Sequence, residues 1–186
     1  MGADGDRPRV VIRPKPWTAG RRMLAATLLW NAALPVAWPA AATDAAPVPI
    51  AVLDLDYLDT SGEARDQTQE HAARIRRFSD ALRSDLARSG KFRIVTPQCG
   101  AAPCAAASEP SELLARAREA GAKLVLIGGV HKQSTLIQWA KVQAVDVDAG
   151  RPVLDKLLTF RGDTDEAWER AEAFVAREVT ALAASQ

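Results

Sequence analysis

The chain has 186 residues and a nearly even charge balance, with 24 Lys and Arg, 23 Asp and Glu, and a formal net charge of +1. Six of the basic and two of the acidic residues fall within the first 42, so the rest of the chain is mildly acidic. A nucleic-acid-binding domain would carry a basic excess gathered on one face, and this composition argues against one.

The N-terminal segment has the order of a secretory signal peptide. Arg21 and Arg22 precede an apolar run, Met23–Val36, and a stretch of small residues ends at Ala42. A positive start, an apolar middle and a small-residue site are typical of a cleaved leader, so we expect a periplasmic or secreted protein cut near Ala42. A retained membrane anchor and a twin-arginine export signal are the alternatives. The expected division is a signal peptide at 1–42, a linker at 43–49 and a single α/β domain at 50–186.

Hydrophobic periodicity predicts the elements of this domain. Apolar residues at three- and four-residue steps indicate the first and last helices, and a continuous apolar run at Leu124–Val130 is typical of a strand buried on both faces. The expected order is β-α-β-α-β-β-β-α, with the first three strands parallel and the last three an antiparallel meander. This predicts a mixed sheet of about five strands with helices packed on it. The strands are expected at 50–58, 92–96, 124–130, 136–147 and 153–160, and the helices at 69–89, 111–120 and 164–184.

Both cysteines of the chain, Cys99 and Cys104, lie in one short loop. Two cysteines in an exported chain indicate a structural disulfide. A redox-active pair, a metal site and free thiols are alternatives. The four intervening residues do not match the usual redox spacing, and zinc would need further Cys or His ligands. We therefore expect a disulfide, and no metal or other cofactor.

The candidate site lies beyond the carboxyl ends of the parallel strands, where open α/β sheets tend to bind ligands. The residues expected there are Asp59, His131, Lys132, Ser134, Thr135, Arg161 and Asp163. Lys132 and Arg161 would make this edge positive and favour a small anionic ligand or a periplasmic protein partner with an acidic segment. The structural alternatives are a helix cap for Asp163 and exposed strand-end charges for Lys132 and Arg161.

A catalytic role has less support. The chain has no nucleophile elbow, and Gly128-Gly129 opens no phosphate-binding helix, so this pair is better explained by close backbone packing or a bulge. His131 paired with Asp59 or Asp163 is the enzyme alternative. His71, at the start of a surface helix, is a weaker candidate.

Three segments together resemble a family of small exported bacterial proteins of unknown function. They are IAVLDLDYLDTS at 50–61, GGVHKQSTLIQW at 128–139 and LTFRGDTDEAW at 158–168. The strand order is also similar to that of the amino-terminal domain of the periplasmic protein TolB. These resemblances carry over no catalytic residues, and they imply an exported binding or accessory protein that is more plausibly non-catalytic than an enzyme.

Overall fold

A computed structural model of the chain describes residues 46–104 and 108–183. The predicted signal peptide lies outside these residues. Within them, no helix is both long enough and apolar enough to cross a membrane. The elements are β1 (Val48–Val52), β2 (Asp56–Asp59), α1 (Thr68–Arg88), β3 (Phe92–Val95), β4 (Gln98–Cys99), β5 (Ala102–Pro103), α2 (Pro110–Glu119), β6 (Leu124–Lys132), β7 (Ile137–Asp146), β8 (Arg151–Arg161) and α3 (Asp165–Leu182).

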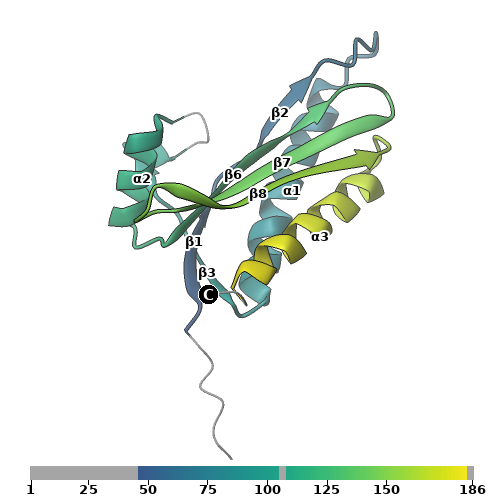
Figure 1. Cartoon of the computed structure of the whole chain (residues 1–186). Coiled ribbons are helices and arrows are strands. Elements are labelled where there is room, and N and C mark those ends of the chain that lie inside the picture. The colour runs from purple at the N-terminus through teal and green to yellow at the C-terminus, as the bar shows by residue number, and fades with distance from the viewer. Residues whose placement is uncertain (1–45, 105–107, 184–186) are drawn as a thin grey trace, which may run out of the picture. The chain divides into compact units, whose positions relative to one another are not determined.

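The predicted mixed α/β sheet is confirmed. Its strand order is β3-β1-β6-β7-β8, and β2 pairs with the far part of β6 beyond the end of β1. β1 is parallel to β3 and to β6, while β6, β7 and β8 form the antiparallel meander. β8 therefore runs parallel to β6, and the ends of β2, β6 and β8 all point toward the same end of the sheet (Figure 1).

The predicted first strand is interrupted in the structure. Between β1 and β2, α1 supplies hydrogen bonds that a neighbouring strand would otherwise make. The guanidinium of Arg83 donates to the carbonyl oxygen of Val52 at 3.0 Å and also to the side-chain carboxylate of Asp54 at 2.5 Å. The hydroxyl of Ser79 accepts from the backbone amide of Leu55 at 3.1 Å. Because these backbone groups are paired, the chain can leave the ladder here and rejoin it as β2.

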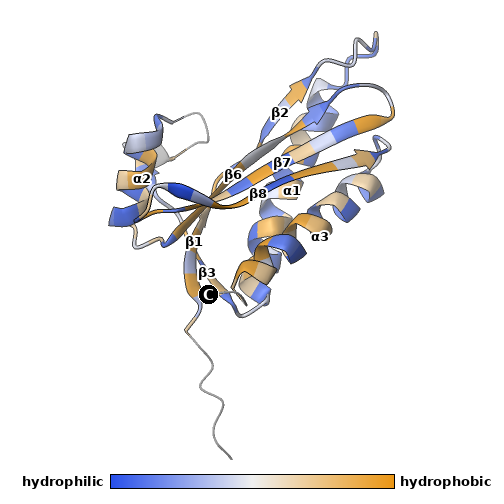
Figure 2. Cartoon of the chain, viewed as in Figure 1, coloured by the Kyte–Doolittle hydropathy of each residue, from blue (hydrophilic) through white to orange (hydrophobic). Residues whose placement is uncertain are grey.

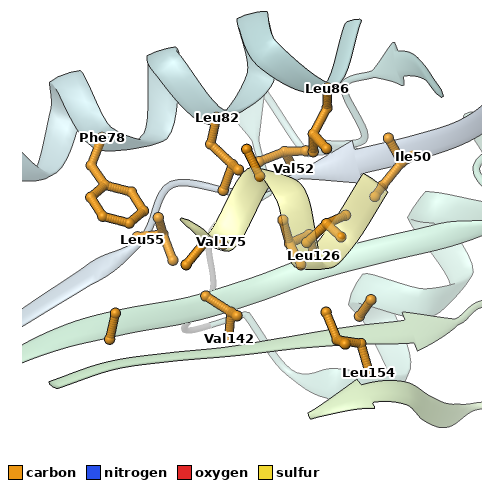
Figure 3. Close-up of a cluster of buried hydrophobic side chains, with 14 of the residues drawn as sticks. Ile50, Val52, Leu55, Phe78, Leu82, Leu86, Leu126, Val142, Leu154 and Val175 are labelled. Carbon is orange, nitrogen blue, oxygen red and sulfur yellow. The ribbon is translucent and has the colours of Figure 1, made fainter. Parts of the chain in front are cut away.

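Alternating residues of the strands pack against helices on opposite faces of the sheet. On one face, α1 and α3 contribute Phe78, Leu82 and Val175 to a large core, as Figure 3 shows. On the other face, α2 packs through Leu113 and Ala117 against a smaller core. The helices are amphipathic, and Figure 2 shows hydrophobic and hydrophilic residues along the same helix.

The predicted disulfide is confirmed. Cys99 and Cys104 are bonded, with their Cα atoms 4.8 Å apart, around the small β4–β5 hairpin. Cys104 is buried in the smaller core with Leu113 of α2. The bond therefore fastens the hairpin to the side of the sheet that α2 covers.

The glycine pair of β6 is explained by close backbone approach. A Cβ atom at Gly129 would lie 2.8 Å from the carbonyl oxygen of Asp56 in β2, and one at Gly128 would overlap the carbonyl oxygen of Lys141 in β7. The side-chain-free positions let β6 pair closely with strands on both sides at this point.

Candidate functional site

Lys132, the last residue of β6, is buried beneath the helices with none of its side chain exposed. Its ammonium donates to the carboxylate of Glu63 at 2.5 Å, to the side-chain oxygen of Gln67 at 2.7 Å and to Asp163 at 2.8 Å. Three acceptors use all three N–H donors of a lysine. The expectation that Lys132 gives this edge an exposed positive charge is therefore wrong, because two carboxylates already neutralise it.

Asp163 is the centre of this buried network. Its Oδ2 accepts from Lys132 and from Nε2 of His71, each at 2.8 Å, and its Oδ1 accepts from Arg74 at 2.8 Å. The indole N–H of Trp168 lies 3.3 Å from Oδ1. Burial alone would raise the pKa of Asp163, but the hydrogen bonds from Lys132 and His71 hold it at about 2. Asp163 is therefore a charged, fully engaged carboxylate at neutral pH.

The cap of α3 is Thr164, not Asp163. The hydroxyl of Thr164 accepts from the amide of Ala167 at 3.3 Å. Gly162 turns the chain with a φ of +94° just after β8, a conformation that favours glycine. Asp163 then faces the interior, and the following residue takes the capping position.

His71 is buried beside Asp163, which contradicts its expected place on a surface helix. Its Nδ1 lies 4.0 Å from the carboxylate of Asp59, and its ring stacks on Tyr57 with centroids 4.7 Å apart. Burial, followed by the charges of Asp59 and Asp163, raises the pKa of Tyr57 above its usual range. Sequence spacing held a signal for this, because His71 stands one turn before Ile75 on the apolar stripe of α1.

The remaining candidates from the loops and from β8 have local roles. The hydroxyl of Ser134 accepts from the amide of Ile137 at 3.1 Å and shapes the β6–β7 turn. Hydrogen bonds from Lys132 and then from Thr135 lower the pKa of Glu63. Arg161 is exposed at the end of β8.

His131 lies on the opposite face of the sheet from Lys132, because successive strand residues alternate in direction. Its Nε2 is 2.7 Å from the hydroxyl of Thr60, and its ring meets that of Trp139 edge-on at 5.8 Å. Within the described residues, no hydrogen bond joins His131 to Asp59 or to Asp163. The sheet therefore separates the histidine and Asp163 that the enzyme alternative would pair.

The face that carries His131 is left uncovered beyond α2. Here Leu58 of β2 and Leu157 of β8 are 55% and 59% exposed, with half-buried Trp139 of β7 between these two strands. Leu58, His131 and Trp139 are consecutive partners across the strands. They line a shallow hollow of about 510 Å³. We call the surface formed by Leu58, His131, Trp139 and Leu157 the open face.

The chemistry of these two sides differs. The buried network consists of groups that neutralise one another, and in the described part of the chain no group of three or more His, Cys, Asp or Glu is placed to hold a metal ion. The open face offers apolar and aromatic contact area with a polar rim. Exposed apolar side chains with a polar rim are typical of an interaction surface.

These features define a small α/β domain with two helices on one sheet face and a partly uncovered second face. The chain belongs to the DUF3280 family, described as a protein of unknown function (DUF2380), whose model matches residues 48–179. This confirms the resemblance to a family of unknown function. No curated protein sequence matches the chain.

Solved structures that are similar to this chain come from several bacteria. The hypothetical protein CT253 from Chlamydia trachomatis has a TM-score of 0.51 and 13% identity, over 75% of this chain and 99% of that one. TolB from Acinetobacter baumannii has a TM-score of 0.46 and 19% identity, over 75% of this chain and 28% of that one. The LpoB C-terminal domain from Salmonella enterica has a TM-score of 0.44 and 20% identity, over 62% and 82% respectively. TolB, which the strand order of this sequence resembles, is thus among the structures to which the chain is similar.

Proposed function

We propose that this protein is an exported, non-catalytic accessory protein that binds a periplasmic protein partner through the open face. The observation that carries the proposal is the exposure of Leu58 and Leu157 on either side of Trp139. Large apolar side chains gathered on one surface lose contact with water when a partner covers them. An aromatic anchor beside them is typical of the centre of an interface.

The buried network supports a binding role over catalysis. A catalytic acid or base needs a proton-transfer partner in the substrate and a pKa near the working pH. Asp163 is held at a pKa of about 2 and is already bound by Lys132, His71 and Arg74. These groups hold the ends of β6 and β8 against α1.

Site-specific photo-crosslinking tests the proposal. A photo-crosslinking amino acid at position 157, in the protein expressed in its own host, should give one discrete adduct with a different protein. Leu58→Glu should abolish that adduct, because a charge would be buried at the interface. The same substitution should change the free energy of unfolding by about 0.5 kcal/mol or less, since position 58 is exposed.

The adjacent residue supplies the matched control. Lys156 is on the same strand but projects to the other face, where it pairs with Glu178 of α3 at 2.7 Å. A crosslinker at position 156 should not give the same adduct. An adduct that forms equally from both positions, or an adduct that consists only of a second copy of this chain, would overturn the proposal, as would the absence of any adduct from position 157.

Export is the second part of the proposal, and it rests on the order of Arg21-Arg22, Met23–Val36 and the small residues up to Ala42. Mass spectrometry of the native protein should find an N-terminus near Thr43 in the periplasmic fraction. Intact leader on soluble cytosolic protein would contradict it, and intact leader in the membrane fraction would show a retained anchor instead.

A further inference from the structure

A second hollow, of about 330 Å³, is lined by residues of α1 and α3 and borders the buried network at Arg74 and Trp168. We call it the helix groove. Its apolar wall is formed by Phe78, Ala81 and Trp168. The two helices pack against each other. The groove is large enough for one long side chain, and it takes no part in the open face.

Glu172 lines the helix groove and is only 6% exposed. Among the described residues, its Oε1 is buried without any hydrogen-bond partner. A buried carboxyl oxygen is normally paired, so an unpaired one in a groove calls for a missing partner. In contrast, both carboxylate oxygens of Asp163 accept hydrogen bonds from side chains of the same domain.

The charges around the groove favour a cation as that partner. Arg74 and Arg77 are both engaged by Asp165 on the rim, at 2.8 and 3.0 Å. Among the described residues, Glu169 and Glu172 form no ion pair with these arginines. Burial, followed by the charge of Asp85, raises the pKa of Glu172 to about 7, so a bound cation would return this carboxyl to its ionised form. The charged groups that face Glu172 or line the groove are Arg74, Arg77, Asp80, Asp85 and Arg88 on α1 and Asp165 and Glu169 on α3.

We propose that the helix groove binds an arginine side chain of a partner protein, with its guanidinium paired to Glu172 and its stem packed on Phe78 and Trp168. A guanidinium is planar, forms paired hydrogen bonds with a carboxylate and stacks on aromatic rings. It therefore matches both the carboxyl of Glu172 and the aromatic wall of the helix groove. The inference depends on the proposed function only in assuming a protein partner, and its test does not involve the open face.

Carbon-13 NMR of the Glu172 side-chain carboxyl, in the purified protein, tests this with Nα-acetyl-arginine N-methylamide as the probe. The expected result is a saturable shift of that signal. With a free pKa of about 7, binding should be about thirtyfold weaker at pH 5.5 than at pH 8.5, because the competent ionised fraction falls by that factor. The matching citrulline derivative has the same shape without the charge and should give no saturable shift.

Two variants locate the site. Glu172→Gln should abolish binding of the probe, which is followed in this variant through the NMR signal of the Trp168 indole. Glu169→Gln, on the rim, should reduce the affinity for the probe less than threefold. The proposal is overturned if the arginine and citrulline derivatives behave alike, or if Glu172→Gln binds as the wild type does. Binding of agmatine without binding of the capped arginine would overturn the assignment to a protein side chain. The absence of a crosslinked adduct from position 157 would overturn the proposed function, but it would not change the result of this titration.

Discussion

Replacing Asp163 by asparagine should strongly destabilise the protein, because it removes the negative charge that Lys132, His71 and Arg74 share. The carboxyl has an ordinary pKa of 3.8 and is held at about 2 in the fold. That difference corresponds to about 2 kcal/mol of stability at neutral pH. The variant also leaves Lys132 buried with a single carboxylate, and breaking a buried ion pair costs about 3–5 kcal/mol. We expect a loss of at least about 3 kcal/mol in the free energy of unfolding, measured by urea denaturation at pH 7.

The pH profile and a neighbouring carboxylate supply the controls. Because the pKa of Asp163 is lowered on folding, its contribution is present above pH 4 and is lost as the pH falls toward 2. Asp163→Asn should therefore flatten the acid limb of the stability profile. Asp165→Asn removes an exposed partner of the same Arg74 and should cost about 1 kcal/mol or less. Equal losses from the two variants would refute the central role of Asp163.

Three further changes have defined outcomes. Folding raises the pKa of Glu172 to about 7, so ionisation of this carboxyl destabilises the fold as the pH rises from about 4.5 through 7. Glu172→Gln should therefore increase the free energy of unfolding by up to about 3 kcal/mol at pH 8 and by little at pH 4, as measured by urea denaturation. Gly128→Ala should cost about 1–3 kcal/mol, because its Cβ would overlap the Lys141 carbonyl oxygen, and hydrogen exchange should show faster opening of the β6–β7 pairing. Replacing Cys99 and Cys104 by serine should cost about 2 kcal/mol, the value for so short a loop, and calorimetry should show a lower melting temperature.

The sequence allowed the fold to be predicted because its information is local. The helices and the meander follow from periodicity over ten to twenty residues, and the disulfide follows from two cysteines in one loop. The interruption between β1 and β2 could not be predicted, because it depends on Arg83 and Ser79 of α1 reaching back to the strand. A local pattern does not show which distant side chain replaces a ladder hydrogen bond.

The sequence predicted that Lys132 and Asp163 lie near each other, but it did not predict that Lys132 is buried. Strand ends placed Lys132 and Asp163 at the same end of the sheet, but lysine at a strand end is ordinarily exposed. Its burial depends on Glu63, 69 residues earlier, and on Asp163, 31 residues later. The burial of His71 and Glu172 could be anticipated from the sequence, because each lies on the apolar stripe of its helix. A charged or titratable residue at such a position marks a group whose partner must be found elsewhere.

The two buried carboxylates have opposite effects on the stability of the domain. Trp168 is close to both carboxyls: its indole N–H donates to Asp163, and it lines the helix groove together with Glu172. Asp163 is bound by cations of this chain and strengthens the fold, whereas the unpaired Glu172 weakens it at neutral pH. Native proteins often lose stability at groups that their function requires. If a cation binds in the helix groove as we propose, its pairing with Glu172 also offsets the free-energy cost of burying that carboxylate.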